Sequence, residues 1–471
     1  MQTSSVTGVG GRFRCLFASL LTAIVTGALI AAILTTAVLA TEYLPADRAQ
    51  ANLRRSFENG SLRTEDWPWN DRIRGYNQYN DCLIVMMIRF RRDPVSSAIA
   101  PVVVFNDYPI QTKLTECQIA RTATFSNNPR ELFSPKIYFP YYRYIHAYRI
   151  PFNILIEITS VDVIRIIYRC VIILLLLTTI LCHVWRTIHS IRLEQVRAAA
   201  ASACFVIVAS GMGIFSGLDL FAQSLTHGPS DILIFSAFAW LSLRKDSLGV
   251  RYDIQVATLG ALAFAFDFLH GTIPLTLAIV LGCAGLRAFG RAAPAPLASA
   301  GRAATVFVVG VVAAAATKLL TLIAVSGWHD ITGFYYQLRY RMDGGEHSLA
   351  QAASALWSSS SHIAGGLSMV GGAAIAFSLL CTLIVPVAAF MPSISSKDRR
   401  AILTAWLSMC TIFCWYVVFR AHSAVHAPFM VRLLAWPISM GPACLMMLAA
   451  SAGWLEGGLR TVPFFGKRHP V

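Results

Sequence analysis

Ten long apolar runs constrain this chain more than any other feature of its sequence. Crossing the hydrocarbon core of a bilayer takes roughly 20 helical residues, and most of the runs reach that length. In lipid, every backbone N–H and C=O must find its partner within the segment, so we expect the runs to be helices. The sequence therefore predicts an all-α membrane protein with about 10 transmembrane helices. The runs lie at about 14–40, 163–185, 199–222, 228–243, 253–269, 271–288, 303–327, 365–391, 401–420 and 432–455.

The composition excludes a soluble protein of this length. Hydrophobic residues make up 56% of the chain and charged residues only 13%, whereas a soluble domain carries about 25% charged residues. The net charge of +15 is spread over short connections between the apolar runs and does not form one basic patch. We therefore predict no nucleic-acid partner.

Basic residues in alternate connections predict the orientation of the helices. Cytoplasmic loops of membrane proteins are enriched in Lys and Arg, and with the N-terminus inside, every cytoplasmic connection is short and basic. The first apolar run exceeds the 7–15 residues of a signal-peptide core, so we expect an uncleaved first helix. The prediction is a multi-pass protein of a bacterial-type inner membrane, with both termini inside. The basic segments are 186–197, 244–251, 287–302, 397–400 and the tail with Arg460, Lys467 and Arg468.

Two long loops fall on the predicted extracytoplasmic side. The first contains the strand-like runs 83–88 and 102–105 between turn signals, and we expect a small α/β cap there. The second is expected to be a lid or a short amphipathic helix. The predicted order is a first transmembrane helix at 1–40, the cap at 41–162, helices two to seven at 163–327, the second loop at 328–364, and helices eight to ten with the tail at 365–471.

Cysteine spacing points to no zinc site and leaves one pairing open. The chain has 11 cysteines, without a CxxC pair, and most lie inside apolar runs, where Cys acts as a small hydrophobe. Cys82 and Cys117 share the first loop. Outside the cytoplasm a disulfide between them is plausible, and two free thiols are the alternative.

Polar residues near helix ends on the extracytoplasmic side indicate where chemistry could occur, because such groups are costly at membrane depth. In the first loop, the turn at 75–81 ends in Asp81, a carboxylate that could act as a general base. The segment 141–149 combines Arg, which binds phosphate through paired hydrogen bonds, with Tyr, which lies at headgroup depth. An ordinary polar turn and an interfacial anchor without a ligand remain the structural alternatives.

Two further clusters lie at the outer ends of apolar runs. Asp267 and His270 are three residues apart and could form an acid/base pair, a metal site or a plain polar helix end. His422 and His426 have the i, i+4 spacing of metal ligands, but without the Glu of HExxH this signal is weak. Substrate contact or a structural role is equally open for this pair and for Arg432, which follows it.

The layout resembles the GT-C superfamily of membrane glycosyltransferases, which have a large first extracytoplasmic loop with an acidic residue. The pieces Tyr-Arg-Tyr-Ile-His-Ala-Tyr at 142–148, Phe-Asp-Phe-Leu-His at 266–270 and the segment 422–432 are similar to bacterial membrane proteins with that architecture. The resemblance implies transfer of a sugar from a polyprenyl-phosphate donor to a cell-envelope glycan or lipid acceptor, with membrane lipid as a further partner.

Roles follow from this resemblance as expectations. The catalytic candidates are Asp81, Asp267 and His270. The substrate-binding candidates are Tyr142, Arg143, His146, Arg149, Arg339, Arg341, His422, His426 and Arg432. No cofactor is assigned, and the participation of a divalent metal stays open. A transporter or flippase for a lipid-linked or small polar substrate is the alternative, although no repeat symmetry typical of transporters is visible. A membrane acyltransferase with His422 as base is a third interpretation.

Overall fold

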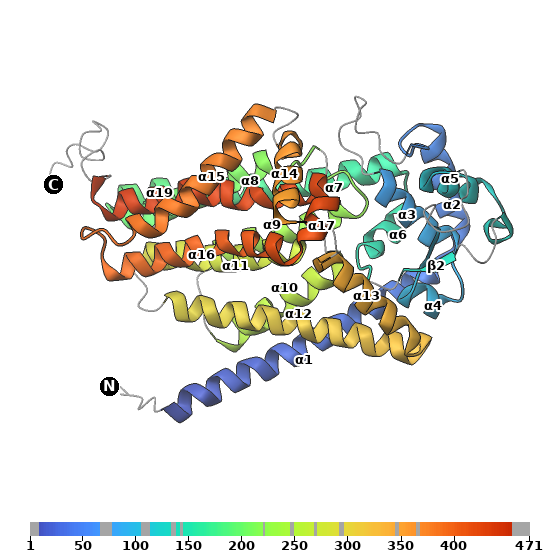
Figure 1. The fold of residues 1–471 in the computed structure, drawn as a ribbon, viewed down its shortest axis with the longest axis horizontal. Coiled ribbons are helices and arrows are strands. Elements are labelled where there is room, and N and C mark those ends of the chain that lie inside the picture. Colours follow the sequence, from blue (N-terminus) through green and yellow to red (C-terminus); the bar gives the residue numbers. More distant parts are fainter. Residues whose placement is uncertain are drawn as a thin grey trace, which may run out of the picture.

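The structure, a computed structural model, describes most of the chain (Figure 1). The described residues are 9–65, 78–104, 114–132, 138–141, 145–219, 222–244, 249–267, 271–291, 296–343, 348–363 and 368–454.

Each of the ten apolar runs contains a long helix. Among the described residues, eight helical stretches are long and apolar enough to cross a membrane, which is consistent with an all-α, multi-pass membrane protein. The last of them runs from Ala427 to Ser451 and ends with α19, which is itself 17 residues long. The helices in the other two runs are α9, which has only 17 residues, and α10, which carries Arg251, Asp253 and Asp267. The helices are α1 (Val9–Glu42), α7 (Val161–Arg192), α8 (Val196–Phe215), α9 (His227–Leu243), α10 (Val250–Asp267), α11 (Thr272–Arg291), α12 (Pro296–Ser326), α15 (Ser368–Ala388), α16 (Ser396–Val418) and α19 (Ala435–Ser451).

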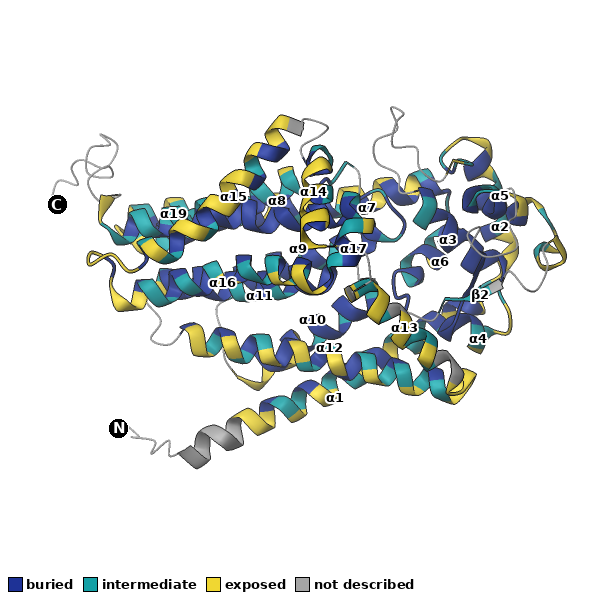
Figure 2. Ribbon diagram, in the orientation of Figure 1, coloured by how far each residue is buried: buried dark blue, intermediate teal, exposed yellow. Residues whose placement is uncertain are grey.

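Buried residues concentrate where these helices face one another, and exposed residues mark the outer faces of α1, α12 and α15 (Figure 2). Helix α11 is buried along nearly its whole length. By contrast, α7 exposes Leu174, Leu181 and Trp185. Large apolar side chains left exposed in this way are expected where a helix faces lipid.

The residues between α1 and α7 fold into a separate unit, which we call the cap. Its elements are α2 (Ala46–Glu58), α3 (Gln78–Arg89), α4 (Pro94–Ile99), β1 (Val102–Val104), α5 (Glu116–Phe125), η2 (Pro129–Leu132), β2 (Tyr138–Pro140) and α6 (Arg149–Ile156). The strands pair antiparallel, with Val103 opposite Phe139. The cap has its own hydrophobic core, centred on α3 and α5, and lies at one end of the helix bundle (Figure 1).

The prediction of a strand at 83–88 was wrong, whereas the strand predicted at 102–105 is present as β1. Residues 83–88 belong to α3, and every residue from Asp81 to Arg89 in that helix is buried. A short apolar run that is buried on all sides has no polar face, so its periodicity cannot distinguish a strand from a helix.

Short helices also fill the second loop and the segment before α19. The second loop contains α13 (His329–Asp343), α14 (Leu349–Ser358) and η4 (Ser360–Ile363), and α17 (Arg420–Val425), α18 (Ala427–Met430) and η5 (Val431–Leu434) precede α19. Helices α13 and α14 contact α17. The second loop is therefore helical in its described part, and it lies against the end of the bundle that carries the cap (Figure 1).

Buried polar contacts join the cap to the bundle. Glu42, at the end of α1, forms an ion pair with Arg149 of α6 and lies 3.0 Å from Nε of Arg91. Lys318 of α12, itself buried, donates a hydrogen bond to the carbonyl of Ile99. Asn153 donates to Thr41 Oγ1 at 2.8 Å. These contacts hold the cap against α1 and α12.

Glycines allow α1, α10 and α12 to approach closely, as small residues do between membrane helices. A Cβ atom added at Gly310 would lie 2.5 Å from the carbonyl oxygen of Ala257 in α10. One added at Gly27 of α1 would lie 2.7 Å from the carbonyl oxygen of Gly310. Both distances are below van der Waals contact with backbone atoms, which cannot move without shifting a helix.

Gly310→Leu is therefore expected to lower stability by about 1–3 kcal/mol, the usual cost of overpacking. The measurement is the apparent unfolding midpoint of the purified protein in detergent. Gly301→Leu, on the same helix, is the matched control, because a Cβ there meets nothing within 4 Å. Equal midpoints for the two variants would contradict this account of the packing.

Candidate functional site

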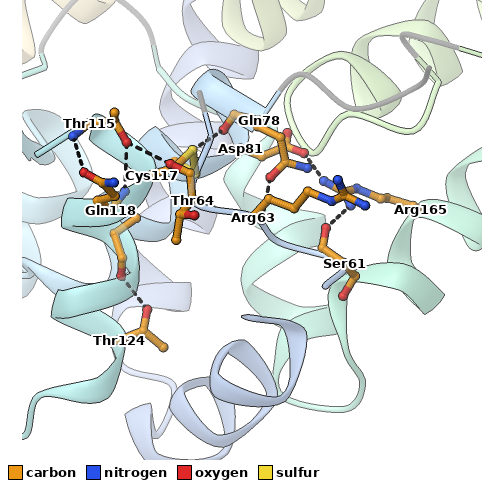
Figure 3. The surroundings of a disulfide bond; sticks show 12 residues. Ser61, Arg63, Thr64, Gln78, Asp81, Thr115, Cys117, Gln118, Thr124 and Arg165 are labelled. Atoms are coloured by element: carbon orange, nitrogen blue, oxygen red, sulfur yellow. Dashed lines mark hydrogen bonds and ion pairs between the residues drawn. A yellow bond between two sulfur atoms is a disulfide. The ribbon is translucent and has the colours of Figure 1, made fainter. Parts of the chain in front are cut away.

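Asp81 lies at the junction of the cap with the bundle, and its side chain is fully buried. Its Oδ2 atom is 2.5 Å from Nη2 of Arg165 on α7 (Figure 3). Its Oδ1 atom accepts hydrogen bonds from the Ser224 hydroxyl at 3.1 Å and the Leu225 N–H at 2.8 Å. Arg165 also donates to the carbonyl of Ser61. Both carboxylate oxygens are thus occupied by groups of this chain.

Burial raises the pKa of the Asp81 carboxyl, while Arg165, the Leu225 N–H and the Ser224 hydroxyl act in the opposite sense. A general base must reach the proton that it removes, and this carboxylate faces its own partners with no exposure to solvent. The geometry fits an attachment point that joins α3 of the cap to α7 and to the segment before α9.

The disulfide that the sequence left open is formed. Cys82, next to Asp81 on α3, is bonded to Cys117 on α5, with their Cα atoms 5.1 Å apart. Both cysteines are buried in the core of the cap. The bond therefore ties together the two helices that form the centre of the cap, directly beside the Asp81 contact (Figure 3).

The predicted phosphate ligands in 141–149 have structural contacts where they are described. His146 adopts φ 57°, and its ring lies 2.7 Å from the Tyr148 hydroxyl and 2.6 Å from the Tyr141 carbonyl oxygen. Arg149 is fully buried against Glu42 and donates to the Ser97 carbonyl at 3.0 Å. Both residues are fully buried, so neither side chain is exposed to lipid. Tyr142 and Arg143 lie outside the described residues.

The Asp267–His270 pair cannot be placed. Asp267 ends α10, but its side chain lies outside the described part of the structure, and so does the whole of His270.

His422 and His426 come together as their spacing predicted. Their rings are 4.5 Å apart, and Arg341 of α13 donates to both: Nη1 lies 3.2 Å from Nδ1 of His422 and also contacts Nε2 of His426. Because guanidinium N–H groups only donate, the two ring nitrogens that face Arg341 act as acceptors. Arg341 and His426 are half-buried and His422 is buried.

A line of polar and aromatic side chains continues from this cluster into the bundle. The ring of Phe429 lies 6.4 Å from that of His426 and 5.5 Å from that of His227, at the start of α9. One turn along α9, Asp231 accepts a hydrogen bond of 2.8 Å from Nη1 of Arg432. We call this set, which consists of His227, Asp231, Arg341, His422, His426, Phe429 and Arg432, the junction cluster.

Arg339 does not belong to the junction cluster. It lies two residues before Arg341 on α13 and is exposed, beside the exposed Tyr336 and Tyr340. Residues two apart on a helix point in nearly opposite directions, so α13 presents one arginine to the histidines and the other away from them.

The described residues contain no group of three or more His, Cys, Asp or Glu side chains that could hold a metal ion. The two histidines instead share an arginine, a cation that disfavours a second cation at the same place. Among the described residues, the arrangement suits an anion better than a metal.

Sequence reasoning missed three ionisable residues that the structure makes prominent. Arg165 and Lys318 lie within apolar runs, and their charge at membrane depth was the signal that could have found them. Glu65, exposed seven residues after the end of α2 at Glu58, forms an adjacent acidic pair in the sequence with Asp66. Asp66 lies outside the described residues.

Comparisons with protein-family models, with curated proteins and with solved structures find no match to this chain.

Asp81→Asn tests the attachment role. Asparagine can still accept from Ser224 and Leu225 but leaves the Arg165 guanidinium buried without a counter-charge, which costs about 3–5 kcal/mol. We expect a clear drop in the unfolding midpoint of the purified protein. Asp93→Asn is the control in the same cap, because Asp93 caps α4 and Asn caps helices equally well. A wild-type midpoint for Asp81→Asn would contradict the attachment role.

Proposed function

We propose that this chain is a membrane glycosyltransferase that moves a sugar from a polyprenyl-phosphate donor to a cell-envelope glycan or lipid acceptor on the extracytoplasmic side. The observation that carries the proposal is the junction cluster at the cap end of the bundle. There Arg341 of the second loop contacts His422 and His426, which lie 81 and 85 residues later in the chain. The resemblance to the GT-C superfamily in sequence layout supports the choice of reaction.

Two observations support an extracytoplasmic cap and a cytoplasmic location for the opposite end of the bundle. Disulfides persist in oxidising compartments outside the cytoplasm, and the cap contains one. The helix ends away from the cap are strongly basic, as the positive-inside rule requires. The basic residues there include Arg186, Arg192, Arg197, Arg244, Arg251, Arg287, Arg291, Arg302, Lys397, Arg399 and Arg400.

In this proposal Arg341 and His426 bind the donor phosphate. Arginine offers paired N–H donors that match phosphate oxygens, and a fixed cation stabilises the negative charge that develops on a leaving phosphate. Both side chains are half-buried and lie at the end of the membrane helices, at the depth of a lipid headgroup. His422 orients Arg341 through its Nδ1 atom, and the buried Asp231–Arg432 pair supports the segment that carries both histidines.

The base is assigned to the acidic pair Glu65-Asp66, with Asp81 in the supporting role that its contacts indicate. Glu65 is exposed at the cap surface, whereas both oxygens of Asp81 are held by Arg165, Ser224 and Leu225. The resemblance is compatible with this choice, because the superfamily has an acidic residue in the first extracytoplasmic loop and Glu65-Asp66 lies in that loop.

Arg341→Gln should reduce sugar transfer by about 100-fold or more, the usual effect of removing one group that stabilises developing charge. Purified protein is incubated with polyprenyl-phosphate sugars and mixed envelope acceptors, and transferred sugar is measured. Arg339→Gln, two residues away and exposed, is the matched control and should retain wild-type transfer.

The outcomes separate the proposal from its alternatives. No transfer by the wild type with any donor, together with substrate-dependent flux in proteoliposomes, would replace the transferase with a transporter. Equal transfer by Arg341→Gln and Arg339→Gln would remove Arg341 from the phosphate site. Loss of transfer in Glu65→Gln or Asp66→Asn with an unchanged unfolding midpoint would support the acidic pair as the base.

A further inference from the structure

At the end of the bundle opposite the cap, two arginines stack with two aromatic rings from three helices. The guanidinium carbon of Arg244, just after α9, lies 5.1 Å from the ring centroid of Trp240 and 5.3 Å from that of Tyr252 on α10. The guanidinium carbon of Arg287 on α11 lies 5.9 Å from the same Tyr252 ring. One tyrosine ring therefore has two cations near it, and we call these four residues the arginine–aromatic stack.

Arg287 has two polar atoms that lack a hydrogen-bond partner in the described part of the chain. The residue is only 7% exposed, and its Nε atom donates to the carbonyl of Cys283 at 3.1 Å. Apart from the interaction of Arg287 with the Tyr252 side chain, Nη1 and Nη2 have no hydrogen-bond partner among the described residues. A buried guanidinium without a counter-charge is costly, so an anion at these two atoms would stabilise the folded protein.

Of the described acidic residues at this end of the bundle, two have arginine partners of their own, and Glu194, between α7 and α8, is exposed. Asp253 forms an ion pair of 2.5 Å with Arg302, and Asp398 forms one of 2.9 Å with Arg197. A third arginine, Arg186, donates to the Ser242 and Leu243 carbonyls at the end of α9. In the described part of the chain, the charged side chains that contact the Tyr252 ring are thus both arginines, Arg244 and Arg287, and positive charge of this kind attracts an anion.

The depth of the stack matches that of a lipid headgroup. Arg287 lies four residues before the end of α11 at Arg291, which at 1.5 Å per residue is about 6 Å from the helix end. Trp and Tyr are enriched at this level of a membrane. Basic pockets between membrane helices bind the headgroups of anionic lipids.

We propose that the arginine–aromatic stack is a binding site for the phosphate of an anionic phospholipid headgroup. Nη1 and Nη2 of Arg287 donate to two phosphate oxygens, the paired geometry that arginine favours, and Arg244 supplies a second cation. The site lies at the opposite end of the bundle from the junction cluster and does not depend on the transferase proposal. Its ligand is a resident lipid of the other leaflet and not a substrate.

The test uses full-length protein in nanodiscs of phosphatidylcholine with increasing fractions of phosphatidylglycerol. The apparent unfolding midpoint of the wild type should rise with phosphatidylglycerol. In Arg287→Gln, the fraction of phosphatidylglycerol needed for the same rise in midpoint should be about fivefold higher. That factor corresponds to about 1 kcal/mol, the contribution of one arginine at a membrane surface. Arg251→Gln, exposed at the same end, is the control and should respond as the wild type does.

Two further measurements test the proposal, one with other variants and one with inorganic phosphate. If Arg287→Gln does not fold, Arg287→Lys and Arg244→Gln replace it. Arg287→Lys should weaken the response to phosphatidylglycerol because lysine lacks the paired donors. Arg244→Gln should weaken it because the second cation is removed. A wild-type response in these variants would overturn the proposal. Inorganic phosphate added to phosphatidylcholine nanodiscs should leave the midpoint unchanged. A rise as large as that from phosphatidylglycerol would show a site for a soluble anion and overturn the lipid assignment.

Discussion

The ion pair between Asp81 and Arg165 connects the two halves of this molecule. Arg165 belongs to a helix long and apolar enough to span a membrane, and Asp81 belongs to the cap; each is buried and would be costly to bury alone. Their pairing at 2.5 Å fixes the cap over α7, and the Ser224 and Leu225 contacts extend that link to the segment that leads into α9. The start of α9, with His227, is thereby held beneath the cap.

The disulfide and the buried network around Glu42 stabilise the same arrangement from two other sides. The Cys82–Cys117 bond holds α3 to α5 beside Asp81, so the carboxylate is presented from a cross-linked element. Glu42 pairs with Arg149, and Lys318 bonds to the Ile99 carbonyl, which ties the cap to α1 and α12. The cap is thus attached at several points to the end of the bundle where the half-buried Arg341 and His426 of the junction cluster lie.

The two ends of the bundle use arginine in different ways. At the cap end Arg341 donates to two histidines whose nearby nitrogens accept, which suits a site where a charged group binds and leaves. At the opposite end Arg287 lies beside an aromatic ring, and two of its nitrogen atoms lack a hydrogen-bond partner among the described residues, which suits a ligand that stays bound. The difference follows from the partners of each guanidinium, since the residue type is the same.

The sequence by itself determined that the chain is largely helical, with several helices long and apolar enough to span a membrane, and it located the strand at 102–104, because apolar length and β-branched composition are local properties. It also indicated that His422 and His426 share a face. Only the tertiary structure decided that residues 83–88 are helical, that Cys82 bonds Cys117, and that Asp81 and Arg149 are occupied by Arg165 and Glu42. The physical reason is distance along the chain. The partner of Asp81 is 84 residues away and that of Arg149 is 107 residues away, and whether a charged side chain faces a ligand or a counter-ion depends on packing that no local pattern records.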